Sequence, residues 1–205
     1  MEHSYNWLEW AKKIQAIAQT GLTYTKDEYD KERYEELREL SKEILSTYTH
    51  VEMGTLTTLF TNESGYATPK IDIRGIVLKE GKLLFVKEKA DNKWSLPGGW
   101  ADIGISPAQI AKKEVKEEAG IEVEVKRVLA IFDRQKHPHP PSPYHIYKIC
   151  FLCDYKSGHL EKGLETSDVA FFDPNHLPEL SLERITHSQI DLLLKAIYEK
   201  SCYFE

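Results

Sequence analysis

Cysteine is scarce in this chain, with three residues among 205, and such an odd, low count argues against a disulfide framework. Cys150 and Cys153 have the CxxC spacing found in zinc and redox sites. They lie in a run typical of a β-strand, where residues three apart point to opposite faces, and no second pair completes a zinc site. We therefore interpret both as buried structural thiols.

Long apolar runs are also lacking. No segment approaches the length that crosses a membrane, and the first residues show no basic region followed by an apolar core. We therefore expect a cytoplasmic protein with no membrane partner.

An excess of basic residues is absent as well. The formal net charge of −6 excludes a general attraction to nucleic acid or to anionic lipid. If so acidic a protein acts on an anionic substrate, it needs a local source of positive charge, which a bound metal ion would provide.

The first fifty residues show the apolar spacing of helices. A helix is expected over residues 5–20, with Gly21 as its stop, and Thr25 with Glu28 forms a capping-box pattern that opens a second helix. We expect residues 1–50 to form a helical N-terminal domain. It is too small for a strong core of its own, so it either docks on the rest of the chain or forms a homodimer with a second copy.

The rest of the chain differs from the first fifty residues in composition and in the spacing of its apolar residues. Residues 51–69 are rich in Thr, Ser and Gly and are expected to form a linker. Residues 70–205 mix several strand-like runs with helices near 107–119 and after Thr186, which predicts an α/β fold with a mixed sheet between helical layers. The expected strands are 71–78, 83–87, 123–132, 144–155 and 169–172.

The helix near 107–119 has clear end signals. Ser106 is a good N-cap, Pro107 suits the first helical position, and Gln109 completes a capping box. Gly120 is a natural stop. Just before this helix, the Gly98–Gly99 pair lets the backbone turn tightly or approach a ligand closely.

Three carboxylates on this helix carry the chemical argument. Glu114, Glu117 and Glu118 are spaced i, i+3, i+4 and cluster on one face, next to an apolar stripe. Like charges at this spacing destabilise a helix, and the last turn disfavours anions. Magnesium prefers carboxylate oxygens, so a bound Mg²⁺ ion would explain the arrangement.

From Gly99 onward, the segment resembles the Nudix box. It matches at seven of nine defined positions, which are Gly99, Glu114, Val115, Glu117, Glu118, Gly120 and Ile121. It departs at Ile105, where the family has Glu, and at Lys113, where the family has Arg. In the family these two residues form an ion pair that supports the loop–helix geometry, so the usual brace is in doubt here.

The resemblance implies a Nudix-type α/β/α sandwich that hydrolyses the pyrophosphate bond of a nucleoside diphosphate derivative. Glu114, Glu117, Glu118 and the Gly98 carbonyl would hold Mg²⁺, with Mn²⁺ as an alternative. The box does not fix the general base. Our candidates are Glu117, then Glu165 and Asp168, while Glu118 joins the catalytic set as a metal ligand.

Substrate contacts are expected from four basic residues. Arg74 lies inside the first strand, where an unpaired charge is costly, so a phosphate or an acidic partner should lie near it. Arg134 and His137 lie in a proline-rich loop that could meet phosphate or base. Lys113 could add positive charge near the site.

Several functions remain open. The leading hypothesis is hydrolysis of CDP-choline to CMP and phosphocholine, because the helical N-terminal segment with this box resembles a bacterial branch of CDP-choline pyrophosphatases. Alternative substrates are ADP-ribose, another nucleotide sugar or a short RNA end. A non-catalytic Nudix-like nucleotide-binding regulator is the alternative from another class.

Overall fold

The computed structural model describes residues 6–49, 52–55, 57 and 63–205. The chain divides into two compact units. One consists of residues 1–69 with 141–145, and the other of residues 70–140 with 146–205. Among the described residues, no helix is long and apolar enough to cross a membrane.

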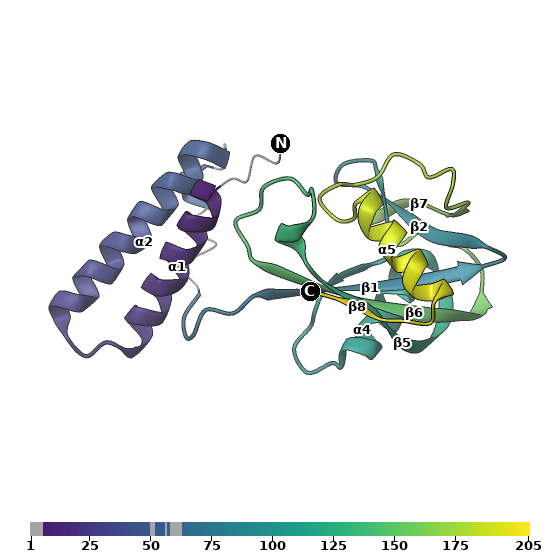
Figure 1. The fold of residues 1–205 in the computed structure, drawn as a ribbon, viewed down its shortest axis with the longest axis horizontal. Coiled ribbons are helices and arrows are strands. Elements are labelled where there is room, and N and C mark those ends of the chain that lie inside the picture. The colour runs from purple at the N-terminus through teal and green to yellow at the C-terminus, as the bar shows by residue number, and fades with distance from the viewer. Residues whose placement is uncertain (1–5, 50–51, 56, 58–62) are drawn as a thin grey trace. The chain divides into compact units, whose positions relative to one another are not determined.

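The first unit is built on a hairpin of two helices, α1 (Asn6–Tyr24) and α2 (Glu28–Thr49), shown in purple and blue in Figure 1. Two N-terminal helices are what the sequence predicts. Their buried core contains Leu8, Ala11 and Leu45. So small a core contributes little stability by itself.

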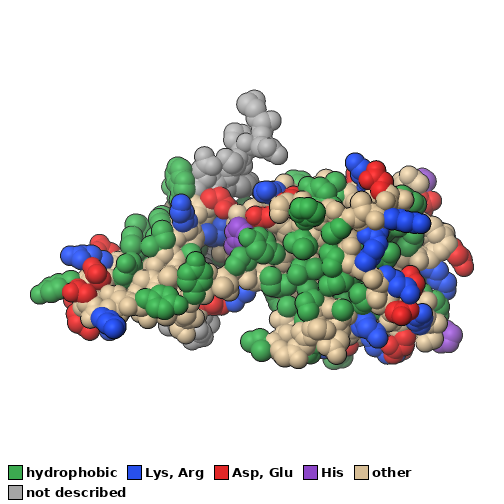
Figure 2. Space-filling view, turned by 60° about the horizontal axis from the view of Figure 1, so that its bottom comes forward, with side chains coloured by type: hydrophobic (Ala, Val, Ile, Leu, Met, Phe, Trp, Pro, Cys, Tyr) green, Lys and Arg blue, Asp and Glu red, His purple; other side chains and the backbone are tan. Residues whose placement is uncertain are grey.

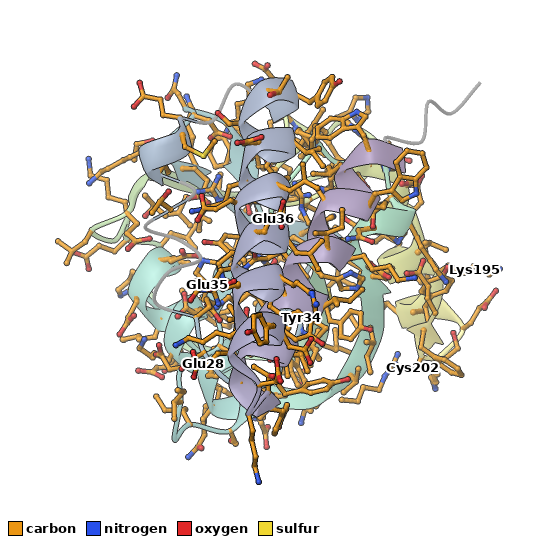
Figure 3. All side chains as sticks on the ribbon, turned by 90° about the vertical axis from the view of Figure 1, so that its left-hand side faces the viewer. Glu28, Tyr34, Glu35, Glu36, Lys195 and Cys202 are labelled. Carbon is orange, nitrogen blue, oxygen red and sulfur yellow. The ribbon has the colours of Figure 1, made fainter. Side chains whose placement is uncertain are left out.

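The prediction that Gly21 ends the first helix is wrong, because α1 continues to Tyr24. A Cβ atom on Gly21 would lie 2.4 Å from Cε1 of Tyr34, whose ring belongs to α2 and is labelled in Figure 3. The absence of a side chain therefore allows close packing of α1 against α2 and does not terminate the helix.

The predicted capping box of Thr25 and Glu28 is also wrong. The structure starts α2 at Glu28, and Oδ1 of Asp27 accepts hydrogen bonds from the backbone N–H groups of Tyr29 (2.9 Å) and Asp30 (3.0 Å). Thr25 Oγ1 accepts the N–H of Asp27 at 3.2 Å and shapes the preceding turn. A carboxylate at this end also interacts favourably with the helix dipole.

Part of the predicted linker 51–69 is helical, at residues 53–55 and 57. The remainder of that prediction falls partly on residues 51, 56 and 58–62, which lie outside the described residues. The same holds for residues 1–5 and 50 of the predicted helical domain.

The second unit is a mixed sheet with a helix on each face, in agreement with the predicted Nudix-type fold (Figure 1). In the described part of the chain, the strand order is β3-β2-β1-β6-β5-β8, with β4 added to β1 and β7 to β2. The strands are β1 (Lys70–Lys79), β2 (Lys82–Glu88), β3 (Trp94–Ser95), β4 (Gly98–Trp100), β5 (Ile121–Asp133), β6 (Ile146–Gly158), β7 (Thr166–Phe172) and β8 (Tyr203–Phe204).

Strand directions make the sheet mixed. The central pair, β1 and β6, is parallel, with Ile71 opposite Tyr147. The pairs β1–β2, β1–β4 and β5–β6 are antiparallel. Because β4 pairs with β1, Gly98 and Gly99 are held against a central strand of the sheet.

Two cores lie on opposite faces of this sheet. One contains Ile190 and Leu193 of α5 (His187–Tyr198), and the other contains Ala111 and Val115 of α4 (Pro107–Ala119). The alternation of side chains along a strand produces this division.

The two cysteines of the CxxC spacing follow the same alternation. Cys150 belongs to the core beneath α5, and Cys153 belongs to the core beneath α4. Both are buried, and burial raises the pKa of each thiol to about 12. The prediction of two structural thiols on opposite faces is confirmed.

Candidate active site

The helix α4, which carries the Nudix-box glutamates, begins and ends where the sequence predicts. Ser106 caps α4, its side chain accepts the N–H of Gln109, and the Gln109 side chain accepts the N–H of Ser106 in return. Gly120 ends the helix in the left-handed conformation, with φ of 76°. The cap and the stop set the two ends of the helix that carries Glu114, Glu117 and Glu118.

Gly98, the first residue of β4, is hydrogen-bonded to this helix. Its backbone N–H donates a hydrogen bond of 2.8 Å to Oε2 of Glu118. Its φ is 144°, and a Cβ atom there would lie 2.0 Å from the carbonyl oxygen of Ile73. Both the positive φ and the close approach to β1 require glycine at this position.

Glu118 is the innermost of the three carboxylates, with 7% of its surface exposed. Burial raises the pKa of Glu118 to about 7, while the nearby Arg74 guanidinium and the Gly98 N–H act in the opposite direction. The neighbouring Glu114 is partly buried, and burial raises its pKa against the opposing charge of Lys113. A bound cation would compensate the negative charge of this pair.

Glu114 also lies close to the glycine pair. A Cβ atom on Gly99 would be 3.1 Å from Oε2 of Glu114. Glu117 is different, since 59% of its side chain is exposed to solvent. The three carboxylates therefore range from the interior to the surface.

A magnesium ion fits this donor set. In the described part of the chain, no three His, Cys, Asp or Glu side chains converge into a closed metal-binding cluster. Magnesium does not need such a cluster, because it keeps several waters and is held by one or two carboxylates together with substrate phosphates. Glu114 and Glu118 supply hard oxygen ligands of this kind, which also suit Mn²⁺.

Arg74 has the acidic partner that the sequence argument requires. Its Nε donates to Oδ1 of Asp72 at 3.0 Å, and its Nη1 donates to the carbonyl oxygen of Leu96 at 2.9 Å. Asp72 also accepts a hydrogen bond from the buried Lys148 ammonium. Burial alone would raise the pKa of Asp72, but the charges of Arg74 and Lys148 hold it below its ordinary value.

The other predicted substrate contacts also have partners within the chain. Nη2 of Arg134 lies 2.8 Å from Glu183, and Nε2 of His137 lies 3.1 Å from Oε1 of Glu205. Burial lowers the pKa of His137, although Glu205 opposes this effect. Roles for Arg134 and His137 in substrate binding stay predictions.

Lys113 lies beside the carboxylates of α4 and is partly exposed. Its Nζ is 2.9 Å from Oδ2 of Asp102, 3.5 Å from Glu117 and 3.6 Å from Glu114. Asp102 follows β4 and was not identified by the sequence argument.

The loop that contains Glu165 is hydrogen-bonded to the end of α4. The hydroxyl of Thr166 donates to the carbonyl oxygen of Glu118 at 3.0 Å and accepts the N–H of Gly163 at 2.7 Å. The side chain of Glu165 is exposed, and its backbone carbonyl accepts the N–H of Lys89. Asp168 is exposed on β7. Glu165 therefore lies next in sequence to a residue that contacts α4.

Glu88 is a further carboxylate of this region that the sequence argument missed. It is 4% exposed, it ends β2 opposite Thr166, and its Oε1 lies 3.0 Å from Nε of Arg184. Burial raises the pKa of Glu88, and its charge contributes to the raised pKa of Glu118. A glutamate at a strand end is usually solvated, so the sequence carries no signal for its burial.

Two family models match this chain. The NUDIX domain matches residues 68–193, and the domain described as "UDP-X-like, N-terminal oligomerisation domain" matches residues 5–60. The chain therefore belongs to the Nudix family and is a Nudix pyrophosphatase, with an N-terminal UDP-X-like oligomerisation domain.

Among similar sequences is a protein of Bacillus subtilis (strain 168) named "Putative ADP-ribose pyrophosphatase YjhB". It is 50% identical over 187 residues, which cover 91% of this chain and 90% of that protein. An ADP-ribose pyrophosphatase of Methanocaldococcus jannaschii is 31% identical over 121 residues, covering 58% of this chain and 70% of its own length.

Two solved structures add to this comparison. A UDP-X diphosphatase has a TM-score of 0.64 and 33% identity, and the match covers 98% of this chain and 99% of that one. An ADP-ribose pyrophosphatase of Streptococcus suis has a TM-score of 0.61 and 39% identity, covering 67% of this chain and 100% of that one.

Proposed function

We propose that this Nudix pyrophosphatase hydrolyses ADP-ribose. In this reaction water adds to one phosphorus of the diphosphate and the other phosphate leaves, which yields AMP and ribose 5-phosphate. The observation that carries the reaction class is Glu118, a buried carboxylate held by the Gly98 N–H beside a second half-buried carboxylate, Glu114. The substrate rests on the relatives from B. subtilis, M. jannaschii and S. suis, whose names assign them to ADP-ribose.

This proposal replaces CDP-choline as the leading substrate. The resemblance that suggested a cytidine nucleotide rested on the N-terminal helices together with the box. The family model for these helices is instead described as UDP-X-like, and the relatives reported above carry ADP-ribose or UDP-X names. The comparisons therefore do not support CDP-choline.

The chain's own residues would bind the metal and accept a proton. Glu114 and Glu118, with the Gly98 carbonyl and with Glu117 from the solvent side, would hold Mg²⁺ or Mn²⁺. When bound, the metal supplies positive charge to the diphosphate and lowers the pKa of a bound water. Glu117 or Glu165, both exposed, would accept the proton that this water loses.

A UDP-linked compound is the second candidate substrate. The solved UDP-X diphosphatase matches both units of this chain, whereas the S. suis structure covers 67% of it. Both candidates are derivatives of a nucleoside diphosphate, and both are small molecules, unlike the short RNA end that is a further alternative.

We also propose that the N-terminal helices join two copies of the chain into a homodimer. The family description of residues 5–60 as an oligomerisation domain supports this. So do large apolar side chains on the surface of α1, among them Trp10, Ile17 and Tyr24, which are 63%, 49% and 66% exposed. Green side chains stand out over this helical hairpin in Figure 2.

The substrate is tested by comparing kcat/KM for ADP-ribose, a UDP-sugar, CDP-choline and a short 5′-triphosphorylated RNA, each with Mg²⁺. We expect the highest value for ADP-ribose. A higher value for the UDP-sugar would replace the substrate but keep the reaction. Absence of cleavage of all four compounds by protein that still binds Mn²⁺ would contradict the proposal and favour a nucleotide-binding role.

A further inference from the structure

The Nudix box of this chain lacks the ion pair that supports the loop–helix geometry in the family. Ile105 stands in place of the glutamate and is 38% exposed, and Lys113 stands in place of the arginine. Both positions have changed together. The loop between β4 and α4, which follows the two glycines, would then depend on other contacts for its position.

Asp102 provides such a contact. It lies three residues before Ile105, in the loop that follows β4, and its Oδ2 accepts a hydrogen bond of 2.9 Å from Nζ of Lys113. The pair spans eleven residues and connects the loop after β4 with the middle of α4. It therefore joins the same two segments that the family pair joins.

The surroundings of Lys113 show why its position matters to the site. Its ammonium lies 3.6 Å from Glu114 and 3.5 Å from Glu117, so it is shared among three carboxylates, with Asp102 the nearest. An ammonium that moved closer to Glu114 would compete with a metal ion for the same oxygens. Asp102 provides an anionic partner away from these ligands.

We propose that Asp102 and Lys113 replace the missing ion pair of the box, and that Asp102 is a positioning residue for the metal-binding carboxylates. The inference rests on the proposed metal site of Glu114 and Glu118. It adds Asp102, which the family pattern does not contain in this role, as the partner of the residue at the box arginine position, and it explains why Ile105 is tolerated.

The same helix offers a control pair. Nζ of Lys116 lies 3.0 Å from Oε1 of Glu122, and both side chains are about half exposed. This pair connects α4 to the start of β5 and does not involve the loop before α4. Loss of an exposed pair of this kind changes little.

The experiment is a titration of the full-length protein with Mn²⁺ in the absence of substrate, followed by calorimetry or by the EPR signal of free Mn²⁺. We expect Asp102→Asn to weaken Mn²⁺ binding about tenfold, the lower end of the range for residues that orient metal ligands. Asp102→Glu should retain binding. Lys116→Gln should stay within about twofold of the wild type.

Rescue by the family's own residues separates positioning from a general loss of structure. In the triple variant D102N/I105E/K113R, the glutamate and arginine of the box are restored, and we expect Mn²⁺ binding to return toward the wild-type value. KM and kcat for the substrate, measured on the same variants, should recover together with metal binding. Thermal unfolding of all variants should match the wild type, because the pair lies at the surface.

Two results would overturn the inference while leaving the proposed function intact. One is unchanged Mn²⁺ binding in Asp102→Asn, and the other is failure of the triple variant to improve on Asp102→Asn. A wild-type protein that binds no Mn²⁺ would instead overturn the proposed metal site and, with it, the inference.

Discussion

The backbone N–H of Gly98 donates a 2.8 Å hydrogen bond to the carboxylate of Glu118, twenty residues later in the chain. This bond connects β4 with α4, and it holds a buried carboxylate in one orientation. Because Gly98 is also paired with Arg74 in the β1–β4 ladder, the orientation of Glu118 is fixed by a central strand of the sheet.

Substitution of Gly98 by alanine tests this connection. The new Cβ would lie 2.0 Å from the carbonyl oxygen of Ile73, so the loop must move and the bond to Glu118 should break. We expect Mg²⁺-dependent hydrolysis to fall by more than about tenfold. Gly104→Ala is the matched control, because Gly104 also has a positive φ, of 84°, but has open space around it. Equal losses of hydrolysis in the two variants would contradict the role of Gly98.

The raised pKa of Glu118 predicts a pH dependence of stability in the metal-free protein. Its pKa moves from 4.5 to about 7, mainly through burial, so the native state keeps a proton that the unfolded state loses within this range. The free energy of unfolding should therefore fall as the pH rises from 4.5 to 7, by up to about 3 kcal/mol from this group.

Urea unfolding of the wild type and of Glu118→Gln, in EDTA and at several pH values, isolates this effect. Glutamine does not titrate, so the stability of the wild type relative to the variant should decrease across the window. A difference between the two proteins that is independent of pH would show that the carboxyl of Glu118 has an ordinary pKa.

The buried ion cluster of β1 and β6 predicts a large loss of stability. Asp72 is 5% exposed and is the carboxylate that both Arg74 and Lys148 contact. Asp72→Asn removes the negative charge that two buried cations share. We therefore expect the free energy of unfolding to fall by about 3–5 kcal/mol. Asp154→Asn, on the exposed side of β6, should change it by less than about 0.5 kcal/mol. Similar values for both variants in urea unfolding would argue against this cluster as a stabilising element.

The proposed homodimer predicts a concentration-dependent sedimentation coefficient. An open groove with a volume of about 610 Å³ is lined by Ile17, Tyr24 and Tyr34 of the helical unit, among other residues. Ile17→Glu replaces an exposed apolar side chain of this groove with a charge and should shift the dimer toward monomer, whereas Lys31→Glu on the exposed surface of α2 should not. A wild-type protein that sediments as a monomer at micromolar concentration would contradict the proposal.

The parts of the fold that the sequence predicts are those with local signals. The helix α4 was predictable at both ends, because Ser106, Gln109 and Gly120 act within a few residues of themselves. The opposite placement of Cys150 and Cys153 follows from strand alternation alone.

The features that the sequence does not predict depend on contacts between distant segments. Gly21 resembles a helix stop, but Tyr34 of the next helix decides its role. The strands β3, β4 and β8 are two or three residues long and show no periodicity to detect.

The same reason explains what was missed in the site. Glu88 is paired with Thr166 across the sheet and with Arg184, and Asp102 is paired with Lys113, all of which are distant from them in the sequence. In contrast, the placement of Glu114, Glu117 and Glu118 on one capped helix was predictable from local sequence signals. Their role as metal ligands stays a prediction.

The most direct test of the account is ADP-ribose hydrolysis by the wild type, Glu118→Gln and Glu122→Gln, with Mg²⁺ and with EDTA. Glu122 is an exposed carboxylate just beyond α4 and controls for the loss of one negative charge. We predict that the wild type and Glu122→Gln release AMP with Mg²⁺ but not with EDTA. In Glu118→Gln the rate of AMP release should fall by more than about 100-fold, which exceeds the usual effect of a residue that only supports the metal ligands. Wild-type activity in Glu118→Gln, or equal activity in EDTA, would contradict the account.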